Sequence, residues 1–386
     1  MKLQASPPRT ILSNYNSVHN YFGWPTVARL RDGRLAVAVS GFRLAHMCPF
    51  GKSVITFSED EGETWSPATV VFDTLLDDRD SGLCPFGDSG LLVTTFNDGP
   101  NLENLARDSR NLEGSPALYE YAGAYLNALR TRPDRDRFAG SLYRISLDNG
   151  RTFGPIRTSP VSCPHGPVLQ KDGSFLYVGN PHVYRDGVLR SSGSELECWR
   201  LTPDGGQELL GKISSAGEGL AMWEPHTVLL PDGKILVHIR VQCADSSTRA
   251  VFTVWQSESY DGGRTFTKPH PIGVEQQGGS PPHLLYHDGL LISTYAHRAE
   301  PHQLRAAFSL DGGETWDCDN VITALPDPHA DFGYASSVAR KDGSILTVYY
   351  GGDPDVPDTA RYAGDGKVYE YPVPVVRSVV WRYSPD

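Results

Sequence analysis

The chain has 386 residues, of which 21% are charged, and its formal net charge at pH 7 is −11. This acidic balance argues against a nucleic-acid or anionic-membrane surface, but it leaves room for a small anionic ligand held by a local arginine cluster. Glycine (39 residues) and proline (29 residues) are frequent, which indicates many short strands joined by tight turns.

No apolar run approaches the ~20 residues of a membrane-spanning helix, and the segment 1–16 lacks the apolar region of a secretory signal. We therefore expect a cytoplasmic protein, or a secreted or periplasmic one if a signal has been removed. The six cysteines are spread along the chain without a Cys-x-x-Cys pair. We expect free thiols, and neither a metal such as zinc nor a cofactor.

Apolar hairpins repeat along the chain, many of them about 55 residues apart. In each hairpin two apolar strands flank a tight turn that contains glycine, which is a strong local signal for antiparallel pairing. The six copies, of which the second is degenerate, lie at 30–39, 85–94, 169–178, 229–238, 285–294 and 339–348.

A second repeat, which we call the Asp box, has the form Ser-x-Asp-x-Gly-x-Thr-aromatic. Its Asp can accept hydrogen bonds from backbone amides of the turn, its Gly can take a positive φ, and its aromatic ring can fill a neighbouring layer. The four copies lie at 58–65, 146–153, 259–266 and 309–316. We interpret them as structural turns on the outer part of each unit, without a part in chemistry.

Together the two repeats predict an all-β fold, a six-bladed β-propeller with four-stranded blades, which forms a single domain over 1–386. The segment 97–138 is interpreted as an insertion within the second blade, and 105–130 is a candidate for a helix that covers the site. We expect the last strand, 378–384, to close the ring together with the N-terminal segment.

In a propeller the first strand of each blade lines the central channel, and its start lies at the same mouth as the end of the second strand. Titratable and basic residues gather at these points. The starts supply Arg79, Asp80, His165, Glu224, His226, His283 and Tyr334, and the ends supply Arg43, Arg240, His297 and Arg298, with His46 just beyond. A single residue of this kind is ordinarily a turn or rim residue, but their coincidence across the blades predicts a site.

The Asp boxes and the hairpin arrangement resemble the sialidase (neuraminidase) superfamily. Glu224 and Arg240, at the two ends of the fourth hairpin, look like the sialidase glutamate and one arginine of its carboxylate-binding triad. Tyr334 in "GYASSV" looks like the sialidase nucleophile, and Arg298 and Arg43 lie near the positions of further sialidase arginines. The resemblance implies a site in which Tyr334 attacks a sugar and Glu224 takes its proton.

Two positions depart from the sialidase pattern. Gly23 in "FGWP" stands where sialidases have the first triad arginine, and 43–52 contains no acid where they have the acid/base aspartate. Cys48 and His46 occupy that region. We expect Asp80 or His46 to replace the missing acid, since imidazole titrates near neutral pH and suits proton transfer.

The leading hypothesis is a retaining, sialidase-like exo-glycosidase that acts on an acidic sugar, either a sialic acid-like sugar or a uronic acid. Its catalytic residues would be Tyr334, Glu224, Asp80 and His46. Its substrate-binding residues would be Arg43, Arg79, His165, His226, Arg240, His283, His297 and Arg298. Two alternatives stay open, a propeller polysaccharide lyase acting on uronates, suggested by the many histidines, and a non-catalytic carbohydrate-binding propeller, suggested by the two departures. The expected partner is an acidic glycan, with neither nucleic acid nor membrane, and the oligomeric state stays open.

Overall fold

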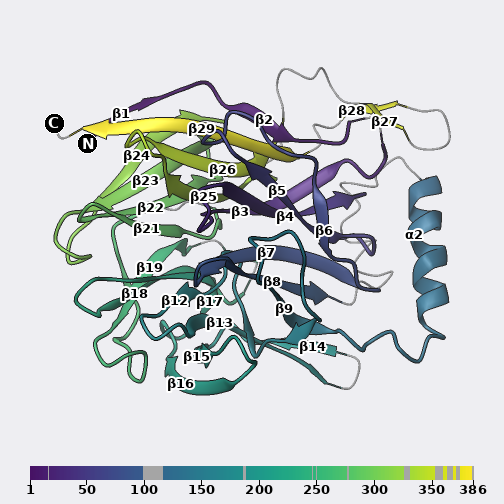
Figure 1. Ribbon diagram of the computed structural model, residues 1–386, viewed down its shortest axis with the longest axis horizontal. Helices are drawn as coiled ribbons and strands as arrows, with labels where there is room; N and C mark the ends of the chain where they lie inside the picture. The colour runs from purple at the N-terminus through teal and green to yellow at the C-terminus, as the bar shows by residue number, and fades with distance from the viewer. Residues whose placement is uncertain are drawn as a thin grey trace.

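The computed structural model describes residues 1–15, 17–98, 116–185, 188–245, 247–248, 250–275, 278–325, 331–352, 360–362, 368–370 and 374–384. These residues form six antiparallel sheets around a central axis, with a helix at one edge (Figure 1). The predicted six-bladed β-propeller is therefore confirmed.

Each blade is a sheet of at least four strands. The first two blades contain β3 (Tyr21–Arg29), β4 (Leu35–Arg43), β5 (Lys52–Ser58) and β6 (Thr69–Phe72), then β7 (Asp77–Phe86), β8 (Gly90–Asp98), β9 (Gly140–Ser146) and β10 (Arg157–Thr158). The third contains β11 (Val161–Ser162), β12 (Val168–Leu169), β13 (Phe175–Arg185), β14 (Val188–Ser191), β15 (Leu196–Leu201) and β16 (Gln207–Ile213).

The fourth and fifth blades contain β17 (Leu220–Leu229), β18 (Ile235–Cys243), β19 (Phe252–Ser259) and β20 (His270–Pro271), then β21 (His283–His287), β22 (Leu290–His297), β23 (Gln303–Ser309) and β24 (Asp317–Ala324). The sixth contains β25 (Gly333–Ala339), β26 (Ile345–Gly351) and β29 (Val375–Ser384) with β1 (Lys2–Ala5) and β2 (Arg9–Leu12), and a separate hairpin is formed by β27 (Ala360–Tyr362) and β28 (Val368–Glu370).

The innermost strands make a closed circle around the channel. Going round it, β3 contacts β7, β7 contacts β12, and the circle continues through β17, β21 and β25 back to β3. Each predicted hairpin supplies the innermost strand of a blade and the strand that pairs with it. Closure of the ring protects the sheet edges that would otherwise be open to solvent.

The ring is closed by the two ends of the chain. The last strand, β29, begins at Val375, earlier than predicted, and pairs with β26 on one side. On its other side it pairs with β1 and β2 from the N-terminus. The predicted closure by both ends is confirmed.

The Asp boxes are turns between the third and fourth strands of their blades, as predicted. In the fifth-blade copy the amide of Gly313 donates to Ser309 Oγ at 2.8 Å, and the amide of Thr315 donates to Asp311 Oδ1 at 3.0 Å. The second-blade copy has the same bonds, and hydrogen bonds from Thr152 hold the pKa of Asp148 at about 2. These carboxylates are therefore satisfied by their own turns.

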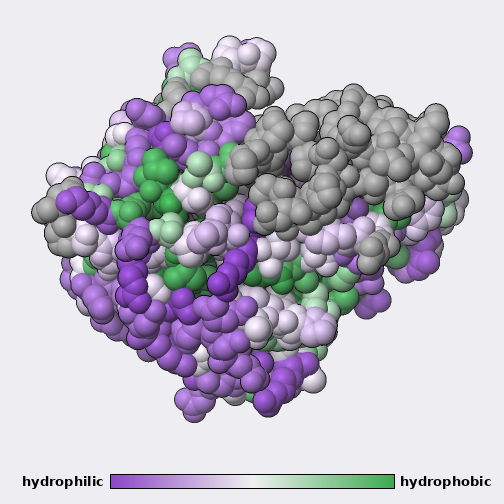
Figure 2. All heavy atoms as spheres, turned by 90° about the horizontal axis from the view of Figure 1, so that it is seen from above, coloured by the Kyte–Doolittle hydropathy of each residue, from purple (hydrophilic) through white to green (hydrophobic). Residues whose placement is uncertain are grey.

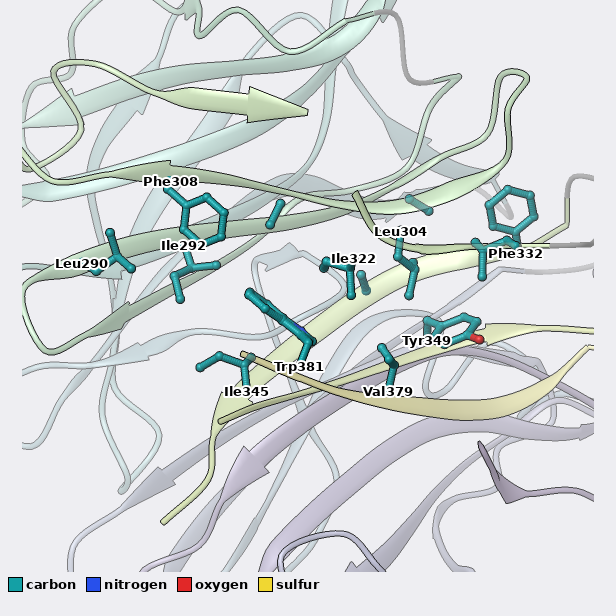
Figure 3. Close-up of a cluster of buried hydrophobic side chains, with 14 residues drawn as sticks. Leu290, Ile292, Leu304, Phe308, Ile322, Phe332, Ile345, Tyr349, Val379 and Trp381 are labelled. Carbon is teal, nitrogen blue, oxygen red and sulfur yellow. The ribbon is translucent and has the colours of Figure 1, made fainter. Parts of the chain in front are cut away.

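Adjacent blades pack through apolar side chains. Between the fifth and sixth blades, Ile292 and Phe308 face Ile345 and Trp381 in a buried cluster (Figure 3). Further clusters of this kind join the third to the fourth blade and the first to the second. Each fully buried side chain of this size contributes about 1.5–3 kcal/mol, so packing between blades holds the ring together. The described surface in Figure 2 is largely hydrophilic, with hydrophobic side chains in small patches.

Helix α2 (Pro116–Leu129) lies between β8 and β9 of the second blade and stands at the right-hand edge of Figure 1. It falls within the segment where a helix was predicted, while 99–115 lies outside the described residues. Its apolar residues Ala122, Leu126 and Leu129 pack on Leu44, Ala45 and Cys48, in the loop that also carries His46. Among the described residues no helix is long and apolar enough to cross a bilayer.

Candidate functional site

Four innermost strands carry the same local irregularity near their starts. In each, the pairing register shifts and one residue has a positive φ: Trp24 (61°), Asp80 (28°), Glu224 (50°) and Tyr334 (51°). A bulge of this kind re-aims a side chain, and strained backbone at equivalent points is typical of functional sites. The bulges therefore mark one site shared by four blades.

Tyr334 and Glu224 form the closest contact of this site. Tyr334 Oη donates to Glu224 Oε1 at 2.5 Å, and Arg240 Nη1 donates to the other oxygen, Oε2, at 2.8 Å. The two charged ends of the fourth hairpin therefore face each other, and the contact predicted between Glu224 and Tyr334 is present. Tyr334 is only 6% exposed. Burial, together with the nearby carboxyl groups of Glu224 and Asp80, places the pKa of Tyr334 well above its ordinary value.

Asp80 is a buried carboxyl group beside this pair. Burial raises the pKa of Asp80 to about 7, and Glu224 adds to the rise while Arg79 opposes it. Its Oδ1 atom has no hydrogen-bond partner among the described residues. Because the pKa lies near neutrality, Asp80 is able to hold and release a proton under physiological conditions.

Arg298 is a further neighbour of Tyr334, with its guanidinium carbon 5.7 Å from the centre of the tyrosine ring. Its Nε donates to the carbonyl of Phe332 at 2.7 Å, Nη1 to the carbonyl of Gly279 at 2.6 Å, and Nη2 to Tyr350 Oη at 3.0 Å. Arg298 therefore supplies positive charge next to Tyr334, but much of its donor capacity already serves the protein.

His46 and Arg79 lie together at the mouth. The side chain of His46 is 34% exposed, and its Nε2 is 3.3 Å from Arg79 Nη2. The guanidinium carbon of Arg79 is 4.2 Å from the ring centre of Trp24, a cation–π contact. Trp24 in turn lies 6.3 Å from Tyr334, ring centre to ring centre. Both predicted residues are thus connected to the site, with Trp24 between Arg79 and Tyr334.

Arg43 is fully buried, at 0% exposure. Its Nη2 donates to Asp77 Oδ2 at 2.9 Å and to the carbonyl of His46 at 2.7 Å, and its Nη1 donates to Ser40 Oγ at 2.7 Å. The guanidinium is used inside the protein, so Arg43 supports the loop that carries His46. This corrects the predicted ligand contact. The sequence pattern could not distinguish Arg43 from Arg79, because the end of a second strand and the start of a first strand lie at the same mouth of the channel.

Three of the predicted substrate-binding histidines form a cluster inside the channel. The rings of His226 and His283 stack at 4.3 Å, and His165 lies edge-on to both at 5.3 and 5.0 Å. The Nδ1 atom of His165 contacts Thr26 Oγ1. The Nδ1 atoms of His226 and His283 accept backbone amides of the fifth and the sixth blade, respectively. His226 is two residues further along its strand than Glu224, so the cluster packs the channel instead of supplying the predicted ligand contacts.

His297 also departs from the prediction. It is 4% exposed, and its Nδ1 lies 2.9 Å from the carbonyl of Ala299 and 3.0 Å from that of Pro301. This is the contact pattern of a histidine that stabilises a turn, so His297 does not join the site.

The two departures from the sialidase pattern have a local structural basis. A side chain at Gly23 would meet the ring of Tyr21, because its Cβ atom would lie 3.1 Å from a ring carbon. Cys48 is buried, and its sulfur accepts the amide of Leu44 at 3.2 Å. Tyr21 thus takes space beside the first position, and Cys48 is a structural residue.

Sequence reasoning missed four members of the site. They are Trp24, Asp331, whose carboxylate lies 3.4 Å from His46 Nδ1, and the two tyrosines that donate to this carboxylate, Tyr21 and Tyr350. Trp24 occupies the same bulge position as Asp80, Glu224 and Tyr334, so an alignment of the strand starts could have found it. The others carry no repeated signal in the sequence. Within the part of the chain that is described, no group of His, Cys, Asp and Glu is arranged to hold a metal ion.

The fold is a six-bladed β-propeller of the kind that sialidases also have. A family model for BNR repeat-like domains matches residues 106–347, more than half of the chain, and the protein belongs to this family.

Solved structures with the same fold are distant in sequence. A protein of unknown function from Dyadobacter fermentans is 16% identical, with a TM-score of 0.68 and 99% of each chain covered. A Trypanosoma rangeli sialidase in complex with the inhibitor DANA is 14% identical, with a TM-score of 0.61, and the match covers 98% of this chain and 60% of the sialidase. The NanB sialidase from Streptococcus pneumoniae is 14% identical, with a TM-score of 0.62, and the match covers 97% of this chain and 70% of NanB. At these identities the likeness concerns the fold. A search of curated proteins found no match to the sequence.

Proposed function

We propose that the protein is a retaining exo-glycosidase that acts on a sugar bearing a carboxylate, either a sialic acid-like sugar or a uronic acid. The observation that carries the proposal is the 2.5 Å contact between Tyr334 Oη and Glu224 Oε1, with Arg240 on the second carboxylate oxygen. A phenol is a poor nucleophile until its proton is removed, and Glu224 is positioned to accept that proton. Two sialidases among the similar folds support the choice of chemistry.

In the first step, Tyr334 Oη attacks the anomeric carbon while its proton passes to Glu224. The bond from that carbon to the leaving oxygen breaks, and a general acid protonates the leaving oxygen. The second step reverses these roles: water attacks the anomeric carbon, the general base takes a proton from the water, and Glu224 returns a proton to Tyr334 as the tyrosyl bond breaks.

Asp80 is the better candidate for the acid and base of this sequence. Its pKa of about 7 allows it to be protonated for the first step and ionised for the second. His46 is the alternative, but each of its ring nitrogens already faces a protein group, Asp331 on one side and Arg79 on the other.

Positive charge for the substrate carboxylate comes from three arginines around Tyr334. Arg240 and Arg79 have side chains 16% and 10% exposed, and Arg298 stacks over the tyrosine ring. Charge-assisted hydrogen bonds from guanidinium groups are the ordinary means of holding a carboxylate in a protein. Because each arginine also has a partner within the protein, we expect the carboxylate to bind by sharing these donors.

The proposal is tested by assaying wild type and Tyr334→Phe on a panel of aryl sialosides and aryl uronides, with the stereochemistry of the product followed by NMR. We expect wild type to release one of the sugars with retention of configuration and Tyr334→Phe to lose at least about a hundredfold in kcat, as for loss of a general-base-activated nucleophile. Tyr260→Phe is the matched control, since Tyr260 is 68% exposed in an Asp box, and it should keep full activity.

The other outcomes either reject the assignment of the nucleophile or identify a different function. Full activity in Tyr334→Phe rejects Tyr334 as the nucleophile. A rise in absorbance near ~235 nm with a uronic polysaccharide, the sign of a conjugated product formed by proton abstraction, identifies a lyase. Binding of intact sugars without any turnover identifies a carbohydrate-binding propeller. Asp80→Asn and His46→Gln separate the two candidate acids, because loss of the acid spares substrates whose leaving group needs no protonation.

A further inference from the structure

Asp331, which precedes β25, presents a carboxylate to the mouth of the channel. Tyr21 Oη donates to its Oδ2 at 2.8 Å and Tyr350 Oη donates to its Oδ1 at 2.9 Å. Both tyrosines are buried, whereas the side chain of Asp331 is 28% exposed. Two rigid donors from two blades therefore fix the orientation of this carboxylate.

The fixed carboxylate faces one nitrogen of His46. His46 Nδ1 lies 3.4 Å from each oxygen of Asp331 and 3.2 Å from Tyr21 Oη. Tyr21 uses its hydrogen for Asp331, so toward His46 its oxygen can only accept. All the groups that face Nδ1 are thus acceptors, which favours the tautomer with hydrogen on Nδ1.

The opposite nitrogen of His46 then carries a lone pair. Arg79 Nη2, which can only donate, lies 3.3 Å from this Nε2. Arg79 is also fixed by its Nη1, which donates to the carbonyl of His46 at 3.1 Å and to Met47 Sδ at 2.9 Å. The order of groups is thus a carboxylate, an imidazole and a guanidinium, each oriented by the one before.

We infer that Asp331 and His46 are positioning residues that hold the guanidinium of Arg79 at the mouth for an anionic group of the substrate. The inference rests on the proposed function for the identity of the ligand, but the tautomer of His46 follows from the contacts alone. Trp24 completes the arrangement, because the guanidinium lies over its ring and the ring lies beside Tyr334.

Asp331→Asn tests this arrangement. The variant has one acceptor oxygen where the wild type has two, and its NH₂ group donates. Because the two tyrosines donate to different oxygens of Asp331, one of them loses its acceptor in the variant. Nδ1 of His46 lies 3.4 Å from both oxygens, so the amide NH₂ is expected to face it whichever oxygen is replaced, and Nδ1 then becomes the acceptor. The hydrogen of His46 moves to Nε2, where it meets the donors of Arg79. Arg79 therefore loses its contact with the ring.

The first measurement is the ¹⁵N NMR spectrum of protein labelled in its histidines, with the His46 signals assigned from His46→Gln. We expect hydrogen on Nδ1 in wild type and in Asp331→Glu, and on Nε2 in Asp331→Asn. Asp288→Asn is the matched control, because Asp288 is 87% exposed and lies 3.5 Å from another histidine, His287, and it should leave the His46 signals unchanged. Hydrogen on Nε2 in wild type, or no response to Asp331→Asn, overturns the inference.

The second measurement uses the best substrate of the panel. We expect KM to rise about tenfold in Asp331→Asn with kcat changed less than about threefold, the pattern for loss of one charge-assisted contact made equally in the ground and transition states. A collapse of kcat at unchanged KM overturns the positioning role of Asp331. If no substrate is found, the proposed function fails while the NMR measurement still decides the inference, so the two failures are distinguishable.

Discussion

The histidine cluster in the channel makes the stability of the protein depend on pH in a way that one substitution isolates. His283 is buried, and its Nδ1 accepts the amide of Ser337 at 3.3 Å. In His283→Asn the amide oxygen can accept the same hydrogen bond, but the side chain no longer titrates. The variant therefore removes one ionisable group and keeps one contact.

The expected size of the effect follows from proton linkage. Burial, with a smaller contribution from His165, lowers the pKa of His283 well below its ordinary value. In the unfolded chain the group titrates near 6.5, so below about pH 6.5 only the unfolded state binds the proton. The stability contribution is present above that pH and is lost as the pH falls. Between pH 8 and pH 5 the loss is about 2 kcal/mol for each such histidine, from RT ln(1 + 10^1.5).

The assay is urea unfolding of wild type and His283→Asn at pH 8 and at pH 5, followed by tryptophan fluorescence. Comparison with wild type is needed because Asp78 and Asp80, whose pKa values burial raises to about 7, act in the opposite direction over the same range. We expect the free energy of unfolding of the variant to fall by about 2 kcal/mol less than that of wild type.

A non-titrating variant in the same channel serves as the control. Ser337→Ala removes hydroxyl contacts to Thr294 and Thr347, and it should lower stability equally at both pH values. If the pH dependence of His283→Asn is parallel to that of wild type, the assignment of a neutral, buried imidazole is refuted.

Two further predictions concern buried carboxyl groups. Asp80→Asn should stabilise the protein above pH 7 by up to about 4 kcal/mol. The pKa of Asp80 is raised from about 4 to about 7, so ionising this carboxyl group in the folded state carries a cost that grows as the pH rises to about 7. Urea unfolding at pH 8 measures the difference, and a variant less stable than wild type contradicts the prediction. Asp77→Asn should lower the free energy of unfolding by about 3–5 kcal/mol, because Arg43 and Asp77 are both 0% exposed and the change leaves a buried guanidinium without its counter-charge. A loss below about 1 kcal/mol in urea unfolding would show that this ion pair does not hold the loop.

Much of the candidate site's composition could be predicted, but its internal arrangement could not. The sialidase-like positions of Glu224 and Tyr334 correctly anticipated their contact. Arg43 and Arg79 look equivalent in the sequence, and both guanidinium groups lie over the ring of Trp24. Arg43 is nevertheless sealed beneath the 44–50 loop at 0% exposure, whereas the side chain of Arg79 is 10% exposed. The difference depends on how a loop and helix α2 pack over the first blade, which local sequence does not encode.

The histidines show the same limit. A repeated histidine near the start of an inner strand predicts proximity to the channel, and His165, His226 and His283 are indeed close together. Whether each histidine reaches a ligand depends on its position along the strand relative to the mouth of the channel. A single bulge residue changes both that position and the direction of the side chain. Asp331 had no signal at all, because its partners Tyr21 and Tyr350 come from two strands of different blades.

The sequence by itself determined the fold. Six hairpins and four Asp boxes repeat a local unit, and the turn residues and apolar strands of each unit can be recognised from its own segment of sequence. Such units bury their apolar faces only by packing against one another in a closed ring. Only the tertiary structure decided which charged groups face the mouth. That outcome rests on bulges at Trp24, Asp80, Glu224 and Tyr334 and on hydrogen bonds between distant blades. Burial and partner choice are properties of the assembled ring, and no single segment of the chain contains them.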